Sequence, residues 1–268
     1  MRVIIIDGGY LMHKGIFAAI TIPKMSPQFL YLRMIAGLLK RVKYNYKTDM
    51  VILAHDGRDS WRKEHSLEYK ADRNENRQKS KPKEWWEETY KTFQDEIKRY
   101  DENLPFHFIT IDRVEADDIA SVACRYFCKS EIVLITKDKD WHQLAKYDYV
   151  KVYNPNEKKW EVIDNPQAIL DDKVEAGDKS DHILGKCKTE EQRQNRILIM
   201  SLLKLPEEIE LKVQLELSGI ENKEMSFMLN INKHIEELRF PSVKTQYYKL
   251  FGKEDPGEDI EIVGEVQW

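Results

Sequence analysis

Acidic side chains recur where the apolar, strand-like runs of this sequence stop. The runs at 3–6, 50–54 and 132–135 are each followed within a few residues by an aspartate. Further acids stand in a Glu-Ala-Asp-Asp cluster and in Asp-x-Asp and Gly-Asp-x-x-Asp spacings. The complete set is Asp7, Asp56, Glu115, Asp117, Asp118, Asp138, Asp140, Asp178 and Asp181.

These carboxylates can share one crevice, because the carboxyl ends of parallel strands meet along one edge of a sheet. Many negative charges gathered there repel and raise one another's pKa unless cations neutralise them. Mg²⁺ prefers oxygen ligands and keeps several waters, which leaves room for a phosphate. Two such ions can activate a water and stabilise the leaving oxygen of a displacement at phosphorus. The set therefore indicates a two-metal phosphodiesterase site.

Each acid taken alone also has a purely structural interpretation. Asp7 and Asp56 precede glycines and could form turns, while Asp138 and Asp140 could cap a helix. Acids in the first turn of a helix also interact well with the helix dipole. Only the ordered combination favours chemistry over these alternatives.

The elements that must position the acids follow from the spacing of apolar residues. Strands are predicted at 1–7, 50–56, 106–111, 132–136 and 150–153. Helices are predicted at 26–44, 83–100, 115–129, 166–173, 190–204, 206–217 and 222–238. Strands that alternate with helices predict an α/β fold with a five-stranded parallel sheet. We expect a core at 1–165, with an insertion at about 57–100, and a helical region at 166–268 with an acidic tail.

Bulk composition excludes several classes of protein. The 268 residues are 41% hydrophobic and 34% charged, with a mean hydropathy of -0.63, which is typical of a globular chain without a membrane span. We expect a cytoplasmic protein. Three cysteines without a CxxC pair suggest neither a disulfide framework nor a zinc site. The net charge is -4, yet basic residues outnumber acidic ones between 58 and 83, which permits a nucleic-acid partner.

Several motifs together resemble those of a known family. They are Ile6-Asp7-Gly8, His55-Asp56-Gly57, Glu68-Tyr69-Lys70-Ala71-Asp72-Arg73, Val114-Glu115-Ala116-Asp117-Asp118, Thr136-Lys137-Asp138-Lys139-Asp140-Trp141 and Ala176-Gly177-Asp178-Lys179-Ser180-Asp181. The sequence resembles the 5′ nucleases, also called flap endonucleases, and most nearly their bacteriophage ribonuclease H branch. The resemblance covers residues 1 to about 182. It implies a PIN-like parallel-sheet core with an arch-like insertion and a smaller helical C-terminal region.

The resemblance also implies a role for individual residues. Asp7, Asp56, Glu115 and Asp117 would hold one Mg²⁺, and Asp138, Asp140, Asp178 and Asp181 a second, with Asp118 binding through water and Mn²⁺ able to substitute. Lys70 and Arg73 would supply positive charge against the scissile phosphate. The arch would contact a single-stranded 5′ end. Its candidate contacts are Arg58, Trp61, Arg62, Lys63, Tyr69, Arg77, Lys79, Lys81 and Lys83. The alternative for the basic residues is a solvated loop without a nucleic-acid partner. The alternative for Trp61 is packing in the core.

The sequence departs from the family pattern after Asp181. The family continues into a glycine-rich helix-two-turn-helix element that binds duplex DNA, often with a potassium ion. Here that element is shortened, because residues 182–189 lead directly to the helix around Arg196. The K⁺ site, the duplex affinity and the choice of substrate are therefore left open. Lys186 or Lys188 could still contact a phosphate.

The interpretation that follows is a 5′→3′ exonuclease or flap endonuclease that acts on 5′ flaps or on RNA–DNA hybrids. We expect a monomer, and the resemblance to the bacteriophage branch suggests a phage-encoded protein. Replication proteins are conceivable partners and a membrane is not. One alternative is a nucleic-acid-binding replication accessory that lacks nuclease activity. Others are a PIN-type ribonuclease and a haloacid-dehalogenase-like phosphatase. The phosphatase would require Asp-x-Asp after the first strand, which Asp7-Gly8-Gly9 lacks.

Overall fold

One mixed sheet forms the centre of the computed structural model, which describes residues 1–22, 25–66, 69–70, 81–220 and 223–254. The strand order is β3-β2-β1-β4-β5-β6, with parallel pairing from β3 through β5 and an antiparallel β6 at the edge. The strands are β1 Arg2–Asp7, β2 Asp49–His55, β3 His107–Thr110, β4 Glu131–Ile135, β5 Val150–Asn154 and β6 Lys159–Trp160. The α/β class and five strands are confirmed, whereas the two-residue β6 was not predicted.

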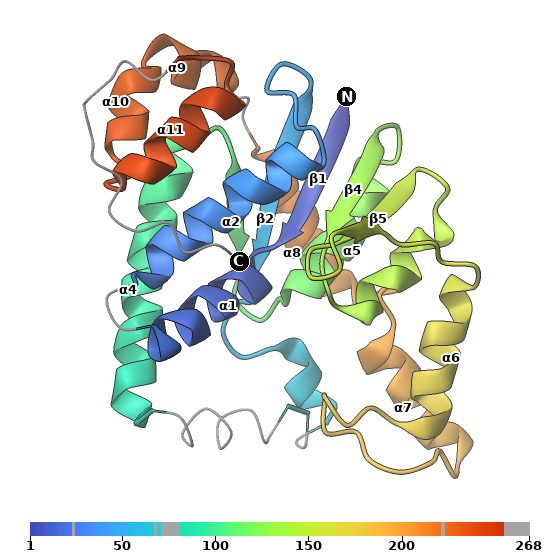
Figure 1. The fold of residues 1–268 in the computed structure, drawn as a ribbon. Coiled ribbons are helices and arrows are strands. Elements are labelled where there is room, and N and C mark those ends of the chain that lie inside the picture. Colours follow the sequence, from blue (N-terminus) through green and yellow to red (C-terminus); the bar gives the residue numbers. More distant parts are fainter. Residues whose placement is uncertain (23–24, 67–68, 71–80, 221–222, 255–268) are drawn as a thin grey trace.

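Helices cover both faces of this sheet (Figure 1). In chain order the longer ones are α1 Gly8–Thr21, α2 Pro27–Arg41, α4 Lys83–Asn103, α5 Ala116–Tyr126, α6 Pro166–Ala176, α7 Glu190–Met200, α8 Glu207–Ser218 and α11 Pro241–Leu250. Shorter elements are the 3₁₀ helices η1 Trp61–Glu64 and η2 Lys139–Lys146, and the helices α9 Glu224–Leu229 and α10 Ile231–Glu236. No helix in the described part of the chain is both long enough and apolar enough to cross a membrane.

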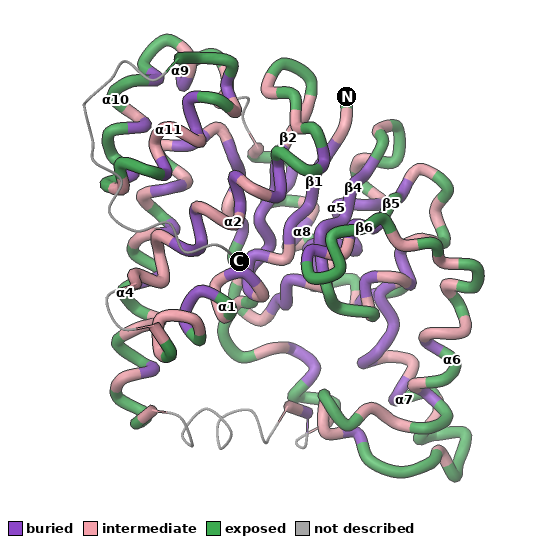
Figure 2. The backbone as a smooth tube through the Cα atoms, in the orientation of Figure 1, coloured by how far each residue is buried: buried purple, intermediate pink, exposed green. Residues whose placement is uncertain are grey.

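Alternate residues of each strand pack into two separate apolar cores. Ile4 and Ile6 of β1 face a cluster with α1, α2, α4 and α11, while Val3 and Ile5 face one with α5 and α8. All four side chains are completely buried, and Figure 2 shows the central strands enclosed along most of their length. Burial on both faces explains why these strands read as continuous apolar runs.

The central position of β1 determines where a site can form. The chain passes from β1 outward to β2 and β3 on one side, then returns to place β4 on the other side of β1. A parallel sheet has its ligand crevice at such a switch point, outside the carboxyl ends of the strands. Asp7 ends β1 at this point, and Asp138 follows β4.

Helix α1 was not predicted, because Asp7-Gly8-Gly9 reads as a turn. The Asp7 side chain instead caps the helix by accepting a hydrogen bond from the Tyr10 backbone N–H at 2.8 Å. Glycine is required at position 8, since a Cβ there would lie 2.4 Å from Nε2 of the buried His55. The helix therefore begins directly at the candidate site.

The C-terminal region is helical, as predicted, but its boundaries differ. The single helix expected at 222–238 is divided into α9 and α10. Helix α11 was missed because Pro241 was taken as a break, although proline fits the first turn of a helix. The acidic tail from residue 255 lies outside the described residues.

Candidate active site

One hydroxyl group connects the side chain of Asp7, at the end of β1, to the backbone of Asp138, after β4. Thr136 Oγ1 donates to Asp7 Oδ2 at 3.2 Å and accepts from the Asp138 backbone N–H at 2.9 Å. The Asp138 side chain in turn accepts from the Asp140 N–H at 2.9 Å, so it caps η2. Asp7, Asp138 and Asp140 are thus positioned together at the switch point.

The acids that follow β2 and β3 are held at the same edge. Asp56 Oδ1 accepts from the backbone N–H of Ala116 at 2.9 Å, which joins the end of β2 to the start of α5. Asp117 Oδ1 accepts from Trp141 Nε1 at 2.7 Å, which joins α5 to η2. The structure therefore gathers carboxylates from four separate chain segments, as the strand-end pattern predicts.

The electrostatic state of this group shows how strongly the acids interact. Burial, with smaller contributions from Asp56 and Asp138, raises the pKa of Asp7 to about 7. Burial and Asp138 raise the pKa of Asp140 to about 6, and the same two causes raise that of Asp117 well above its usual range. Because each shift disfavours the charged form, a cation that binds in this crevice must displace protons from these carboxylates.

Glu115 differs from its neighbours because three groups donate to a single oxygen of its carboxylate. Tyr69 OH and Lys70 Nζ each lie 2.9 Å from Oε2, and Arg62 Nη1 lies 3.2 Å from it. Burial opposes ionisation of Glu115, but Lys70 and Arg62 outweigh it and lower its pKa to about 2. Glu115 is therefore held in its ionised form by these three donors, and its side chain also accepts from the backbone N–H of Asp118 in a capping box.

Three expected nucleic-acid contacts are contradicted by the structure. Trp61, Arg62 and Tyr69 are only 2–3% exposed. Trp61 Nε1 donates to Asp118 Oδ2 at 3.0 Å, and the Tyr69 hydroxyl is engaged with Glu115. Because these side chains are enclosed, they support the acids instead of contacting a strand in solution. The alternative of packing for Trp61 is correct.

Asp118 is also reassigned, from a water-mediated metal ligand to the anchor of Arg62. Its side chain is completely buried. Arg62 Nη1 and Nη2 donate to its two oxygens at 3.0 and 2.7 Å, a two-pronged geometry that matches guanidinium to carboxylate. Arg62 Nε also donates to the backbone carbonyl of Ile199 at 2.7 Å, so this residue connects η1, α5 and α7.

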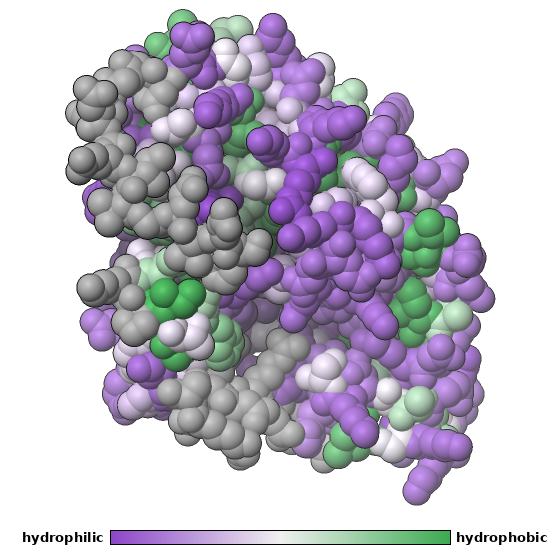
Figure 3. Space-filling view, viewed as in Figure 1, coloured by the Kyte–Doolittle hydropathy of each residue, from purple (hydrophilic) through white to green (hydrophobic). Residues whose placement is uncertain are grey.

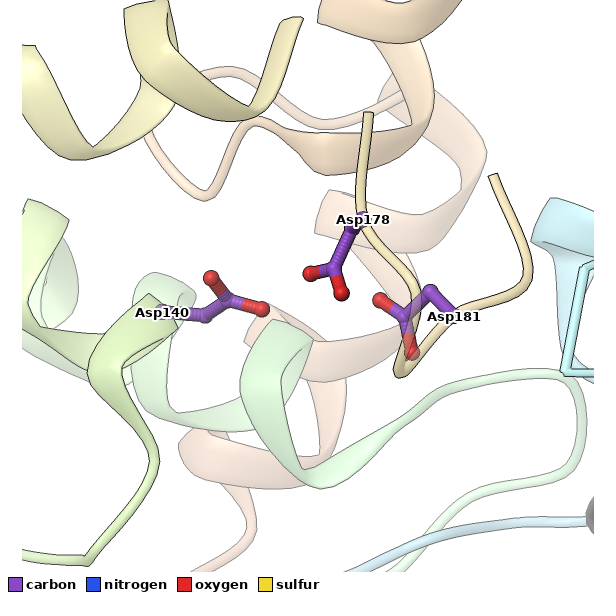
Figure 4. Close-up of side chains that lie close together, drawn as sticks. All are labelled: Asp140, Asp178 and Asp181. Carbon is purple, nitrogen blue, oxygen red and sulfur yellow. The ribbon is translucent and has the colours of Figure 1, made fainter. Parts of the chain in front are cut away.

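A second group of acids lies where α6 ends. Asp140, Asp178 and Asp181 each offer a carboxylate oxygen, and these oxygens lie within 4.8 Å of one another (Figure 4). Gly177 permits this turn with a φ of 83°, and a Cβ there would lie 2.3 Å from the Ile183 carbonyl oxygen. The donors are all carboxylate oxygens, so the group fits a hard divalent cation such as Mg²⁺.

Sequence reasoning missed Lys173, which belongs to this group. Its ammonium forms ion pairs with both Asp140 and Asp178. Burial opposes its charge, but the two carboxylates outweigh that effect and raise its pKa. The available signal was a lysine in the last turn of a helix directly before Gly-Asp.

Lys70 lies between the two groups of acids. Its ammonium contacts Glu115, and its backbone N–H donates to the Asp181 carbonyl oxygen at 3.0 Å. It holds a left-handed backbone conformation with a φ of 56°. Lys70 therefore connects Glu115 to the segment that carries Asp181. Arg73, expected to act beside it, lies outside the described residues.

The remaining basic residues of the insertion are only partly described. Arg58 and Lys63 are exposed, Lys83 forms an ion pair with Glu87 at 3.5 Å, and the Lys81 ammonium lies 5.7 Å from the centre of the Trp85 ring. Arg77 and Lys79 lie outside the described residues.

The segment after Asp181 is organised by one buried arginine. Arg196 on α7 donates to the backbone carbonyls of Val174, Leu184 and Gly185 at 2.9, 3.1 and 2.8 Å. Lys186 and Lys188 in the same segment are exposed. The turn between α6 and α7 is therefore fixed from within.

Fold and site define a class of protein: an α/β protein with a carboxylate-rich crevice at the switch point of a parallel sheet. Residues 2–175 match the family model described as the N-terminal resolvase-like domain of 5′-3′ exonucleases. The chain belongs to this family. The resemblance drawn from its motifs is thereby confirmed.

Two curated relatives match part of the chain. Ribonuclease H of Enterobacteria phage T4 is 32% identical over 161 residues, covering 54% of this chain and 51% of that protein. A 5′-3′ exonuclease of Mycoplasmopsis pulmonis (strain UAB CTIP) is 25% identical over 194 residues, covering 69% and 61%. The chain thus spans about half of the T4 protein's length and 61% of the other's.

Solved structures show the same fold. The D15 protein of phage T5, crystallised with metal ions, gives a TM-score of 0.56 at 19% identity, covering 93% of this chain and 97% of that one. A complex of the T5 D15 flap endonuclease with DNA and metal ions gives 0.56 at 18% identity, covering 94% and 100%. The parallel-sheet α/β fold with a helical C-terminal region is confirmed.

The buried pair of Arg62 and Asp118 can be tested by Arg62→Met. Removing the cation leaves a buried carboxylate without its partner, so we expect a loss of about 3–5 kcal/mol in the free energy of unfolding. Arg58→Met, at an exposed position four residues earlier, should change it by less than about 0.5 kcal/mol. Urea denaturation measures both variants. Equal stability of the two would contradict the role of Arg62.

The raised pKa of Asp7 predicts a pH dependence of stability in EDTA. Between its usual pKa of 3.8 and about 7, the native state holds a proton that the unfolded state releases. The contribution of Asp7 to the free energy of unfolding must therefore fall as pH rises from about 4 to about 7. Buried His55 and His107, with pKa values lowered to about 3 and about 4, act in the opposite sense.

The measurement that isolates Asp7 is thus the difference between Asp7→Asn and the parent. Urea denaturation at pH 5 and pH 8 should show the variant gaining stability relative to the parent at the higher pH. Added Mg²⁺ should narrow that difference at pH 8, because a cation stabilises the ionised parent. A difference independent of pH would show that Asp7 is not held with a raised pKa.

Proposed function

We propose that this chain is a divalent-cation-dependent 5′ nuclease that hydrolyses phosphodiester bonds near the junction of single and double strands. The observation that carries the proposal is the position of Lys70 between two groups of carboxylates. It contacts Glu115 through its ammonium and Asp181 through its backbone. A phosphate bound between the two groups would meet a cationic side chain there.

The ligand sets of the two Mg²⁺ ions are part of this proposal, and Mn²⁺ would substitute. Asp7, Asp56, Glu115 and Asp117 would hold the first ion. Asp138, Asp140, Asp178 and Asp181 would hold the second. When bound, two such cations supply activation of the attacking water and stabilisation of the leaving oxygen. The solved T5 D15 structure that contains metal ions supports a metal-dependent reaction in this fold.

The protein's own residues orient the reaction in this proposal. Tyr69 and Lys70 fix the carboxylate of Glu115 by hydrogen bonds, which would orient it as a ligand of the first ion. The Lys70 ammonium would stabilise the negative charge that develops on the phosphate in the transition state. A donor held in position contributes most in this role. Lys173 would neutralise Asp140 and Asp178 and hold them close together until a cation binds.

The proposed substrates are 5′ flaps and RNA primers on DNA. Support comes from the names of the relatives, a ribonuclease H and a flap endonuclease complexed with DNA. We assign the core at 1–165 to catalysis, its region 57–100 to the single-stranded end and residues 166–268 to the duplex. Exposed Arg58 and Lys63 remain the described candidates for contacts with the strand.

An accessory protein without nuclease activity is the alternative from another class. Asp7 and Asp117 oppose it, because burying carboxylates without compensation destabilises a fold. A chain that no longer bound cations would gain stability by replacing them.

Asp138→Ala tests the catalytic assignment. The variant should lose cleavage of a 5′-labelled flap duplex and of a matching RNA–DNA hybrid in Mg²⁺, while retaining most of its affinity for either. Comparing the two substrates also gives the preference for DNA or RNA. Asp148→Ala is the matched control, because Asp148 is exposed and precedes β5 at the opposite edge of the sheet. Full activity of the Asp138 variant would refute the metal assignment.

Lys70→Ala tests the transition-state role. We expect the cleavage rate at saturating substrate to fall by ~10² or more, as for removal of one transition-state donor. Single-turnover kinetics would separate this rate from binding. A change in affinity alone would assign Lys70 to positioning of the phosphate. A thermal melt of the variant guards against a folding defect, since Lys70 contacts Glu115.

A further inference from the structure

A second set of polar side chains lies beside the carboxylates, on α1 and the turn between β5 and β6. Tyr10 donates through its backbone N–H to Asp7 and through its phenol to Asn156 Oδ1. Lys14, one helical turn further along α1, donates through Nζ to the Tyr10 hydroxyl at 3.1 Å and to Asn156 Oδ1 at 3.0 Å. The Lys14 ammonium is therefore held by two neutral oxygens.

A second ammonium shares the same aromatic ring. Lys137 Nζ lies 5.1 Å from the centre of the Tyr10 ring, and Lys14 Nζ lies 5.5 Å from it. A ring attracts a cation at an exposed site by only about 0.5–1 kcal/mol, whereas two ammonium groups repel each other. Among the described residues, neither lysine forms an ion pair with a carboxylate. The arrangement is thus two positioned cations without an anion.

These cations are adjacent to the candidate catalytic acids. Lys137 stands between Thr136 and Asp138, the residues that connect β4 to Asp7 through hydrogen bonds. Tyr10 lies in the first turn of the helix that Asp7 caps. Figure 3 shows hydrophilic side chains covering this side of the molecule over β4 and β5. An anion bound by the two lysines would therefore lie next to the crevice.

We propose that Lys14 and Lys137, held by Tyr10 and Asn156, form a clamp for one backbone phosphate of the strand that is cut. The clamp rests on the proposed function, since it places this phosphate beside the scissile bond. A phosphodiester fits because it presents two anionic oxygens and can bridge two ammonium groups. The Tyr10 ring acts as the support of the lysines and not as a stacking platform, because both cations already occupy it.

The test is the salt dependence of binding to a fluorescently labelled single-stranded oligonucleotide, measured by anisotropy in EDTA from about 50 to about 200 mM KCl. Losing one phosphate contact on a single strand reduces the slope of log K against log[salt] by about 0.7. Lys14→Ala and Lys137→Ala should each weaken binding several-fold and reduce the slope. Because both serve one phosphate, the double variant should lose less than the sum of the two.

Two variants serve as controls. Lys14→Arg should retain the parent slope, because it keeps the charge on α1. Lys249→Ala removes an exposed charge from α11, on the helical layer that covers α2, and should leave the slope unchanged. If Lys14→Ala and Lys137→Ala match the parent, or if Lys249→Ala loses as much as they do, the clamp is refuted.

The clamp and the proposed function fail separately. Binding is measured without a divalent cation, so a protein without nuclease activity would still show the slope change if the clamp exists. Conversely, Mg²⁺-dependent cleavage with unchanged slopes in both lysine variants would uphold the nuclease and overturn the clamp.

Discussion

Compensation of negative charge is the constraint on which the rest of this structure depends. Arg62 neutralises Asp118 and part of Glu115, Lys70 neutralises the remainder of Glu115, and Lys173 lies between Asp140 and Asp178. Arg62 and Lys70 are distant in sequence from the acids that they contact. Lys173 lies on α6 and contacts Asp140 of η2 and Asp178 of the turn after α6.

The negative charges of Asp7 and Asp117 are not compensated in the same way. Glu115 has its pKa lowered by its bases, whereas Asp7 and Asp117 have theirs raised by burial and by neighbouring acids. Ionisation is therefore favoured at Glu115 and disfavoured at Asp7 and Asp117. This division follows from the local partners, because Lys70 and Arg62 contact Glu115 while burial dominates at Asp7 and Asp117.

The fold was predictable from the sequence where a pattern is local. Strands buried on both faces give apolar runs, and their ends locate Asp7 and Asp138. Helix α1 was not predictable, because the need for Gly8 arises from the ring of His55, which is distant in sequence. From the neighbouring residues alone, Gly8 is interpreted as part of a turn.

The candidate site divides in the same way. The acids could be found from their positions at strand ends, but their partners could not. Arg62 stands in a polar segment that resembles an exposed basic loop, and only its contacts with Asp118 and Ile199 show that it is buried. The role of Lys173 likewise depends on its ion pair with Asp140, which lies in another element, η2. The sequence shows whether a residue is acidic or basic, but it does not show which residue of opposite charge it will contact in the fold.

The end of α7 is fixed against the core by buried polar groups. Its last backbone carbonyls accept from buried side chains of the core: Arg62 Nε reaches Ile199 at 2.7 Å, and Gln143 Nε2 reaches Met200 at 3.1 Å. Gln143 also accepts from the Leu202 N–H at 3.1 Å. Buried polar groups of this kind specify one arrangement, because any displacement would leave them without partners. The position of α7 relative to the candidate site is thus fixed by side chains of the core, Arg62 and Gln143.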